Sequence, residues 1–192
     1  MSPATVDKNT IENAIEGDQS AFREIYEQYK APLFNFIVRM TGNRADAEDI
    51  LQNVFVKIFR KITTLRASGA FTTWLFTTAR NETINHIRKR DRRKFDSIEN
   101  DDNHQLDEQI LSSNHRHVTP ETNATDSDLQ KKVEAALMEV PEVNRAAFVL
   151  GVLEGYSYKE VGEMLDCSVS NVKLRVFRTR AILTKKLRPY FN

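Results

Sequence analysis

The sequence predicts an all-α protein, in which a flexible acidic linker joins two small helical domains and the C-terminal domain is a helix-turn-helix. Three observations predict it. Apolar residues recur at three- and four-residue steps in both halves of the 192-residue chain, and no stretch alternates as a strand would. Residues 96–128 are rich in Asp, Asn, Ser, Thr and His, so they cannot bury enough apolar surface to offset their ordering entropy. The C-terminal segment has two short helix patterns around a polar break. We therefore expect domains at residues 1–95 and 129–192, and a linker at residues 96–128.

The first domain is expected to begin with two long amphipathic helices. One carries helically spaced apolar residues from Phe22 to Met40, is interrupted or kinked at Pro32, and ends at Gly42-Asn43. The next opens near Asp46 as its N-cap. Its apolar stripe is wide enough to pack on two neighbours and consists of Ile50, Leu51, Val54, Phe55, Ile58, Phe59 and Ile62.

A loop and a third helix are expected to complete this domain. The loop covers residues 63–70, where Gly69 supplies backbone freedom. The helix runs from about Phe71 through Arg88 or beyond and ends in the basic run 88–94. Its apolar residues include Trp74, Leu75, Ile84 and Ile87.

Four helices are expected in the second domain, at Leu129–Met138, Glu142–Glu154, Tyr158–Leu165 and Val169–Leu187. Pro141 suits the start of the second and Gly155 the position after its end. Ser168 is expected to cap the last helix. The last two helices are expected to share a small core of Val161, Leu165, Val169, Val172 and Val176.

Charge is strongly segregated, although the whole chain carries only +1. Residues 1–95 hold 16 basic and 11 acidic side chains, residues 96–128 hold one and nine, and residues 129–192 hold 11 and seven. Two basic blocks therefore flank an acidic one.

The C-terminal basic block predicts contact with DNA. The last 26 residues hold seven basic side chains and no acidic one. A short helix followed by a basic one is the pattern of a DNA-reading helix-turn-helix. The side chains expected to face outward, toward bases and phosphates, are Ser170, Asn171, Lys173, Arg175 and Arg178. The alternative is a solvated basic helix on an ordinary bundle, which the seven-to-zero bias disfavours.

The run 88–94 follows a helix that bears Phe71, Trp74 and Phe76. Bases of single-stranded DNA stack on aromatic rings while cations follow the phosphates. Helical aromatics are equally expected in a core, and a basic helix end complements the helix dipole. Composition leaves both interpretations open.

Catalytic and metal-binding patterns are absent from the sequence, so we expect neither an enzyme nor a cofactor. Three of the four histidines lie in the expected linker, and no glycine-rich phosphate loop or nucleophile-base set is visible. Cys167 is the only cysteine, and it is expected to be a small apolar residue in the turn. No apolar run approaches the ~20 residues of a membrane span, and no signal sequence opens the chain. We expect a cytoplasmic protein without membrane insertion.

Two groups of motifs, in this order, resemble the extracytoplasmic-function (ECF) class of RNA polymerase sigma factors, and the resemblance covers nearly the whole chain. The first group is Gly42–Phe59 and Gly69–Asn81 with the arginine cluster that follows. The second group is Val140–Arg145, Glu154–Gly162 and Val172–Ala181. Two groups at the right spacing are far more specific than a lone helix-turn-helix.

The resemblance implies a function for each domain and no catalysis. The first domain would dock on core RNA polymerase through Asp49, Gln52, Asn53 and Phe55. The loop 63–70 and the helix after it would recognise the −10 promoter element and its melted non-template strand, through Trp74, Arg80, Asn81, Asn85, Arg88 and Arg92. The second domain would read the duplex −35 element with Ser170, Asn171, Lys173, Arg175, Arg178 and Arg180. The family commonly has an anti-sigma factor as a further partner.

Three residues depart from the pattern of the family. Asn53 stands where the family often has Glu, Asn85 where many members have Asp, and Leu174 where a small residue is common.

The linker's net charge is −8, and it resembles the charge of the nucleic acid to which the linker would give way in the polymerase channels. Replacing its acids with Ser or Asn should weaken core binding or change abortive synthesis, and the absence of both effects would refute this hypothesis.

Two other functions compete with this one. A helix-turn-helix regulator could bind duplex DNA as a dimer without polymerase, but it leaves the basic-aromatic first domain unexplained. A serine recombinase would need a strand-rich catalytic domain, whereas the N-terminal half predicts helices only.

Overall fold

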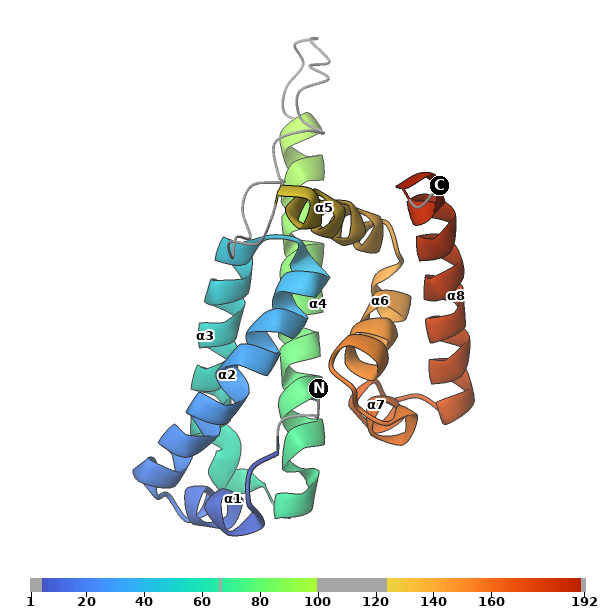
Figure 1. Ribbon diagram of the computed structural model, residues 1–192. Helices are drawn as coiled ribbons and strands as arrows, with labels where there is room; N and C mark the ends of the chain where they lie inside the picture. The colour runs from blue at the N-terminus through green and yellow to red at the C-terminus, as the bar shows by residue number, and fades with distance from the viewer. Residues whose placement is uncertain (1–4, 66, 100–123, 191–192) are drawn as a thin grey trace.

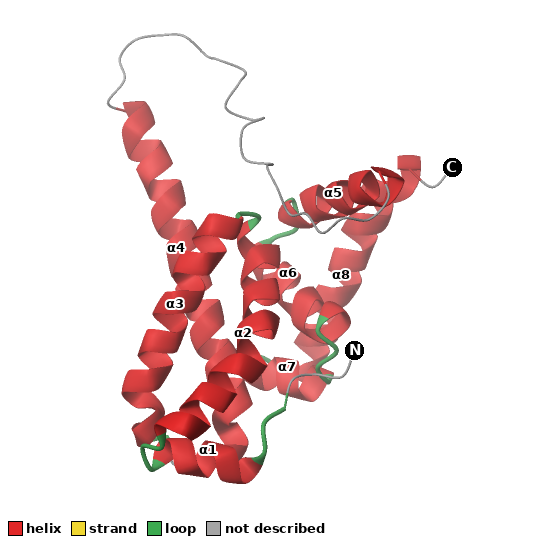
Figure 2. Ribbon diagram, turned by 60° about the vertical axis from the view of Figure 1, so that its left-hand side comes forward, coloured by secondary structure: helices red, strands yellow, loops and turns green. Residues whose placement is uncertain are grey.

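The computed structural model describes residues 5–65, 67–99 and 124–190. Within these ranges the chain forms helices and turns, and no described residue lies in a strand (Figure 2). The expected all-α class is confirmed.

The first half of the chain contains four α-helices, α1 (Lys8–Ile15), α2 (Gln19–Thr41), α3 (Arg44–Lys61) and α4 (Phe71–Glu99). Two short 3-10 turns, η1 (Ile62–Thr64) and η2 (Ser68–Ala70), lie where a loop was expected. Pro32 lies inside α2, which is helical on both sides of it. In Figure 1, α2, α3 and α4 stand side by side and α1 crosses their lower end.

Asn43, and not Asp46, caps the N-terminus of α3. Gly42 ends α2 with φ 68°, and the extended Asn43 then accepts a hydrogen bond from the backbone N–H of Asp46 at 3.0 Å. The Asp46 carboxylate instead faces α4, 3.3 Å from His86 Nε2 and 3.4 Å from Arg90 Nη1. The prediction for Asp46 was wrong because the left-handed glycine starts the new helix earlier than the acidic residues indicate.

The second half contains α5 (Ala124–Met138), α6 (Glu142–Phe148), α7 (Tyr158–Met164) and α8 (Val169–Leu187). A π-helical turn, η4 (Val149–Leu153), continues α6, and a 3-10 turn, η5 (Arg188–Tyr190), follows α8. Gly155, with φ 81°, follows η4 as its sequence position indicated. Helices α4 and α5 extend into both ends of the expected linker, and residues 100–123 lie outside the described residues.

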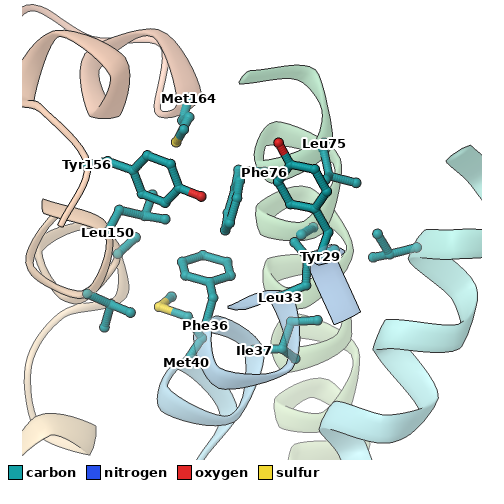
Figure 3. Close-up of a cluster of buried hydrophobic side chains, with 14 of the residues drawn as sticks. Tyr29, Leu33, Phe36, Ile37, Met40, Leu75, Phe76, Leu150, Tyr156 and Met164 are labelled. Atoms are coloured by element: carbon teal, nitrogen blue, oxygen red, sulfur yellow. The ribbon is translucent and has the colours of Figure 1, made fainter. Parts of the chain in front are cut away.

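One hydrophobic core runs through both halves of the chain. The buried face of α2 carries Tyr29, Leu33, Phe36, Ile37 and Met40, and it meets α3 and α4 on one side and the second half on the other (Figure 3). The two expected domains are therefore packed together, a relationship that the sequence did not indicate.

Candidate nucleic-acid interface

Helices α7 and α8 form a tight helix-turn-helix. Val161, Leu165, Val172 and Val176 are buried between them, as expected. A Cβ on Gly162 would lie 2.7 Å from the carbonyl oxygen of Cys167, so the turn needs a glycine there. The Ser168 hydroxyl accepts a hydrogen bond from the backbone N–H of Asn171 at 3.2 Å, which confirms the expected cap.

Val169 does not belong to this small core. Its side chain is 39% exposed, because it occupies the first position of α8, where the helix has just left the turn. Its prediction as a core residue was wrong. Cys167 is half-buried in the turn.

The outward face of α8 presents polar and basic side chains. Ser170, Asn171, Lys173, Arg178 and Arg180 are exposed on the helix. Arg175 is half-buried, and its Nη1 donates to Cys167 Sγ at 3.4 Å. Five of the six residues expected to read duplex DNA are therefore accessible, whereas Arg175 lies at the edge of the turn. Figure 1 shows α8 at the outer edge of the molecule.

Leu174 and Phe177 lie in the middle of this basic face and were not among the expected site residues. They are 44% and 69% exposed. They project opposite the buried Val172, Val176 and Thr179, at a three-residue spacing. A helical projection of the sequence would have found them, since the apolar pattern of α8 leaves both outside the buried stripe.

Helix α4 presents a second polar stripe. Asn81, Asn85, Arg88 and Arg92 are exposed at steps of four, three and four residues, which places them on one face. Trp74 lies seven residues, or two helical turns, before Asn81 on the same face, and it is half-buried with its ring 6.1 Å from that of Phe71.

The aromatic residues of α4 divide between core and surface. Phe71 and Phe76 are fully buried, which supports the core interpretation for both of them. Of these three aromatic residues only Trp74 is partly exposed, so only its ring is accessible for a base to stack on.

Arg80 lies beside the exposed stripe of α4 and is half-buried. Its Nη1 donates to the carbonyl oxygen of Leu165 at 3.0 Å, and its Nε and Nη2 donate to Asn81 Oδ1 at 3.1 and 2.9 Å. One of the residues expected at the −10 surface is therefore held by the helix-turn-helix.

A third exposed face lies on α3. Asp49, Gln52 and Asn53 are exposed, whereas Phe55 is only 6% exposed and packs its ring 4.6 Å from that of Tyr26. Phe55 therefore holds α3 on α2 and is not accessible to a partner. Val56 and Phe59 also lie on this face, 47% and 55% exposed, although neither was expected there. Phe59 was expected in the packed stripe of α3, and only one edge of it packs, with its ring 5.0 Å from that of Phe22.

Neither a metal centre nor a membrane span is present in the part of the chain that the structure describes. No group of three His, Cys, Asp or Glu side chains is placed to hold an ion there. None of the described helices is both long enough and apolar enough to cross a bilayer.

Comparison with known proteins gives two family matches in this chain. Residues 25–93 match Sigma-70 region 2, and residues 130–183 match Sigma-70 region 4. The ECF RNA polymerase sigma factor SigW of Bacillus subtilis is 32% identical over 183 residues, which cover 94% of this chain and 96% of SigW. The ECF RNA polymerase sigma-E factor of Haemophilus influenzae is 29% identical over 192 residues, which cover 98% of this chain and 99% of that factor.

A solved structure shares the fold. CnrH, in its complex with the cytosolic domain of CnrY, matches 95% of this chain and 97% of its own, with a TM-score of 0.70 and 21% identity. At this identity the likeness concerns the arrangement of the helices.

Proposed function

Because the chain belongs to the extracytoplasmic-function class of RNA polymerase sigma factors, we propose that it binds core RNA polymerase in the cytoplasm and directs initiation at promoters with −10 and −35 elements. Sigma factors are transcription initiation factors. The observation that carries the proposal is the presence of two separate exposed polar faces, on α4 and α8, each within its own family match. A dimeric regulator that binds duplex DNA without polymerase would account for only one of these two faces.

Residues 129–192 would bind the −35 element. Exposed Asn171, Lys173 and Arg178 can donate to base edges or phosphates when α8 enters the major groove. Leu174 and Phe177 lie between them and can only make apolar contacts, for which the C5-methyl group of thymine is the partner in that groove. The −35 element of this protein would therefore include thymine opposite this pair.

Residues 1–95 would recognise and melt the −10 element. The exposed stripe of α4 offers amide donors at Asn81 and Asn85, cations at Arg88 and Arg92, and the ring of Trp74. Melted DNA exposes the faces of its bases, so stacking and phosphate contact suit this combination.

Core polymerase would dock on the exposed face of α3. Asp49, Gln52 and Asn53 provide its polar part, and Val56 and Phe59 add the apolar contact that a protein interface needs at its centre. Phe55 would support this face from inside. An anti-sigma factor would be a further partner, consistent with a fold shared with a sigma factor solved in such a complex.

Binding and run-off transcription with purified core polymerase test this proposal. The labelled chain should bind core, and transcripts should arise from discrete starts on a genomic fragment library only when both are present. An Asp49→Lys, Val56→Ser double variant changes only exposed side chains of α3, so it should fold and lose both activities together. Duplex binding by the chain without core binding or transcripts would support the dimeric regulator instead.

A further inference from the structure

Helix α1 packs against the segment that is expected to read the −10 element. This segment, the −10 loop (residues 63–70), joins α3 to α4 and includes most of η1 and all of η2. Helix α1 contacts η1 and η2 as well as α2. Its side chains Ile11 and Ala14 are 5% and 2% exposed, so α1 is part of the core at this end of the bundle (Figure 1).

One side chain of the −10 loop is fixed by α1. Ser68 is 7% exposed, whereas its neighbours Ala67, Gly69 and Ala70 are exposed. The Ser68 hydroxyl donates to Oε1 of Glu12 at 3.1 Å, across 56 positions of sequence. A hydrogen bond to a carboxylate is roughly twice as strong as one between neutral groups. Glu12 therefore gives this buried hydroxyl a strong partner and ties the loop to α1.

A second contact fixes the chain just after the −10 loop. The Tyr29 side chain of α2 is fully buried, and its hydroxyl lies 2.7 Å from Thr72 Oγ1 in the first turn of α4. The backbone of Val6 is hydrogen-bonded to the same hydroxyl. The segment 6–12 is therefore linked both to the loop, at Ser68, and to the start of α4, at Thr72.

The −10 loop has few side chains that could hold its shape. Ala67, Gly69 and Ala70 carry at most a methyl group, and a Cβ on Gly69 would meet nothing within 4 Å. Small residues lose much backbone freedom when they become ordered. Ordering the loop only when DNA binds would weaken binding, and a contact that orders it beforehand avoids this loss. The bond between Ser68 and Glu12 is such a contact.

We propose that α1 positions the −10 loop for promoter recognition, and that Glu12 is a positioning residue that acts through Ser68. The proposal rests on the proposed function, because it concerns the −10 element that residues 1–95 would read. Glu12 contacts the loop and not the DNA. Removing its carboxylate should therefore leave core docking and reading of the −35 element unchanged, while the loop loses its fixed position.

The alternative is that α1 only stabilises the fold of the first half of the chain. A second pair of a hydroxyl and a carboxylate separates the two roles, because Thr10 Oγ1 donates to Glu24 Oε1 at 3.4 Å and so joins α1 to α2 instead of to the loop. Lys8 Nζ lies 3.3 Å from Glu12 Oε1 at the surface, and its removal leaves the bond to Ser68 in place. Glu24→Ala and Lys8→Ala are thus the matched controls.

Glu12→Ala and Ser68→Ala each remove one end of the bond between α1 and the loop. Each should lower open-complex formation about tenfold, the effect of losing one hydrogen bond to a charged group, and should weaken the base preference in the −10 element. Glu12→Gln keeps an acceptor oxygen, so it should restore part of the loss. The Glu12→Ala, Ser68→Ala double variant should be no worse than either single variant, because both remove the same contact.

Holoenzymes made from the full chain and purified core polymerase test the proposal. The DNA is the promoter that gives the most run-off transcript with the parent chain, together with its single-base variants in each element. The −10 preference should weaken in Glu12→Ala and Ser68→Ala, less in Glu12→Gln, and not in Glu24→Ala or Lys8→Ala. Core binding and the −35 preference should match the parent in every variant, which also shows that the variants fold.

Three outcomes would overturn this role of α1. They are an unchanged −10 preference in Glu12→Ala and Ser68→Ala, an equal loss in Glu24→Ala, and additive losses in the double variant. A parent chain that forms no open complexes with core refutes the proposed function itself. A parent chain that forms them, while the −10 preference of the variants stays unchanged, refutes only the role of α1.

Discussion

Arg80 Nη1 lies 3.0 Å from the carbonyl oxygen of Leu165, across 85 positions of sequence. A residue beside the α4 stripe thereby completes the end of α7, the first helix of the helix-turn-helix. The contact couples the two DNA-reading regions of the chain.

Arg80 and Arg88 should have separable effects. Arg80→Gln should lower promoter melting and also the closed fraction, which is the fraction of chains whose two halves are packed together as in the structure. The reason is that its guanidinium joins the two halves and is expected at the −10 strand. Losing a charged hydrogen bond of about 2 kcal/mol should change the open-to-closed ratio about thirtyfold. Arg88 is exposed, so Arg88→Gln should lower melting alone. Energy transfer between labels on the two halves and open-complex formation measure the two effects, and equal changes in transfer would contradict this assignment.

Arg178 should read a base at the −35 element. It is exposed on the outward face of α8, so Arg178→Ala should weaken holoenzyme binding to the matched element by about 1–3 kcal/mol and relax the preference at one position. Half-buried Arg175 should show a smaller effect on base preference. Binding titrations against single-base variants measure both. A uniform loss over all sequences, with a salt slope reduced by about 0.9, would identify Arg178 as a phosphate contact.

Leu174 and Phe177 should contact thymine methyl groups. Substituting deoxyuridine for thymidine in the −35 element removes only the C5-methyl, and should weaken binding of the parent holoenzyme by about 1 kcal/mol per contact. Leu174→Ala should bind more weakly and lose its sensitivity to one of these substitutions. Since Leu174 is 44% exposed, the change should leave the fold intact. Equal sensitivity in both proteins would contradict the contact.

Much of the fold follows from the sequence, because helical spacing records burial directly. The cap at Ser168 and most of the stripe of α3 were predicted and are present, although Phe59 of that stripe is 55% exposed. Local sequence signals gave the wrong role to two residues. Asp46 is not the N-cap of α3, because the left-handed Gly42 makes the helix start earlier. Val169 is not a core residue, because the first position of α8 leaves its side chain exposed.

The interface between the two halves of the chain could not be predicted from the sequence, because its contacts join residues that are far apart in it. Arg39, Arg145 and Glu154 look like ordinary surface charges in the sequence, and their partners are distant residues or backbone carbonyls that carry no sequence signal. The burial of Phe55 was missed in a similar way. A family motif identifies its position, but the motif does not say that its ring packs on Tyr26 rather than facing a partner.

Glu154, which pairs with Arg39 of α2, should make the packing of the two halves of the chain depend on pH. Burial raises the pKa of its carboxyl above the ordinary 4.5, and the attraction of Arg39 only partly opposes this. In an opened chain the carboxyl is hydrated and its pKa returns toward 4.5, so the closed form binds the proton more tightly. By linkage, the closed form gains stability as pH falls through the raised pKa toward 4.5 and loses it as pH rises.

Donor and acceptor labels can be attached at the exposed Gln28 and Glu163 through Cys substitutions in a Cys167→Ser background. Energy transfer between them should be higher at about pH 5 than at about pH 8. Burial raises the pKa of Tyr156, which also lies near this carboxyl, so its hydroxyl stays protonated over this range. Glu154→Gln provides the control and should flatten the dependence. An unchanged slope in that variant, or transfer that rises with pH, would contradict the assignment.

Asn53 should limit the affinity for core polymerase. It is exposed on the proposed docking face of α3, at a position where the family often has Glu. Asn53→Glu should tighten core binding by up to about fivefold, the range of an exposed ion pair, and the effect should fade at high salt. Asn53→Gln is the neutral control that matches Glu in size. Tighter binding by both variants, or by neither, would show that charge at this position does not contribute.

Sequencing the 5′ ends of transcripts made from a genomic library by purified core, with and without the chain, tests the central claim most directly. The account predicts new starts that share two upstream elements at a constant separation, with thymine in the upstream one. Arg178→Ala should alter the preference in that upstream element alone. Starts that share a single inverted repeat, or no new starts from a folded chain, would contradict the assignment of the two reading faces to one promoter-recognition protein.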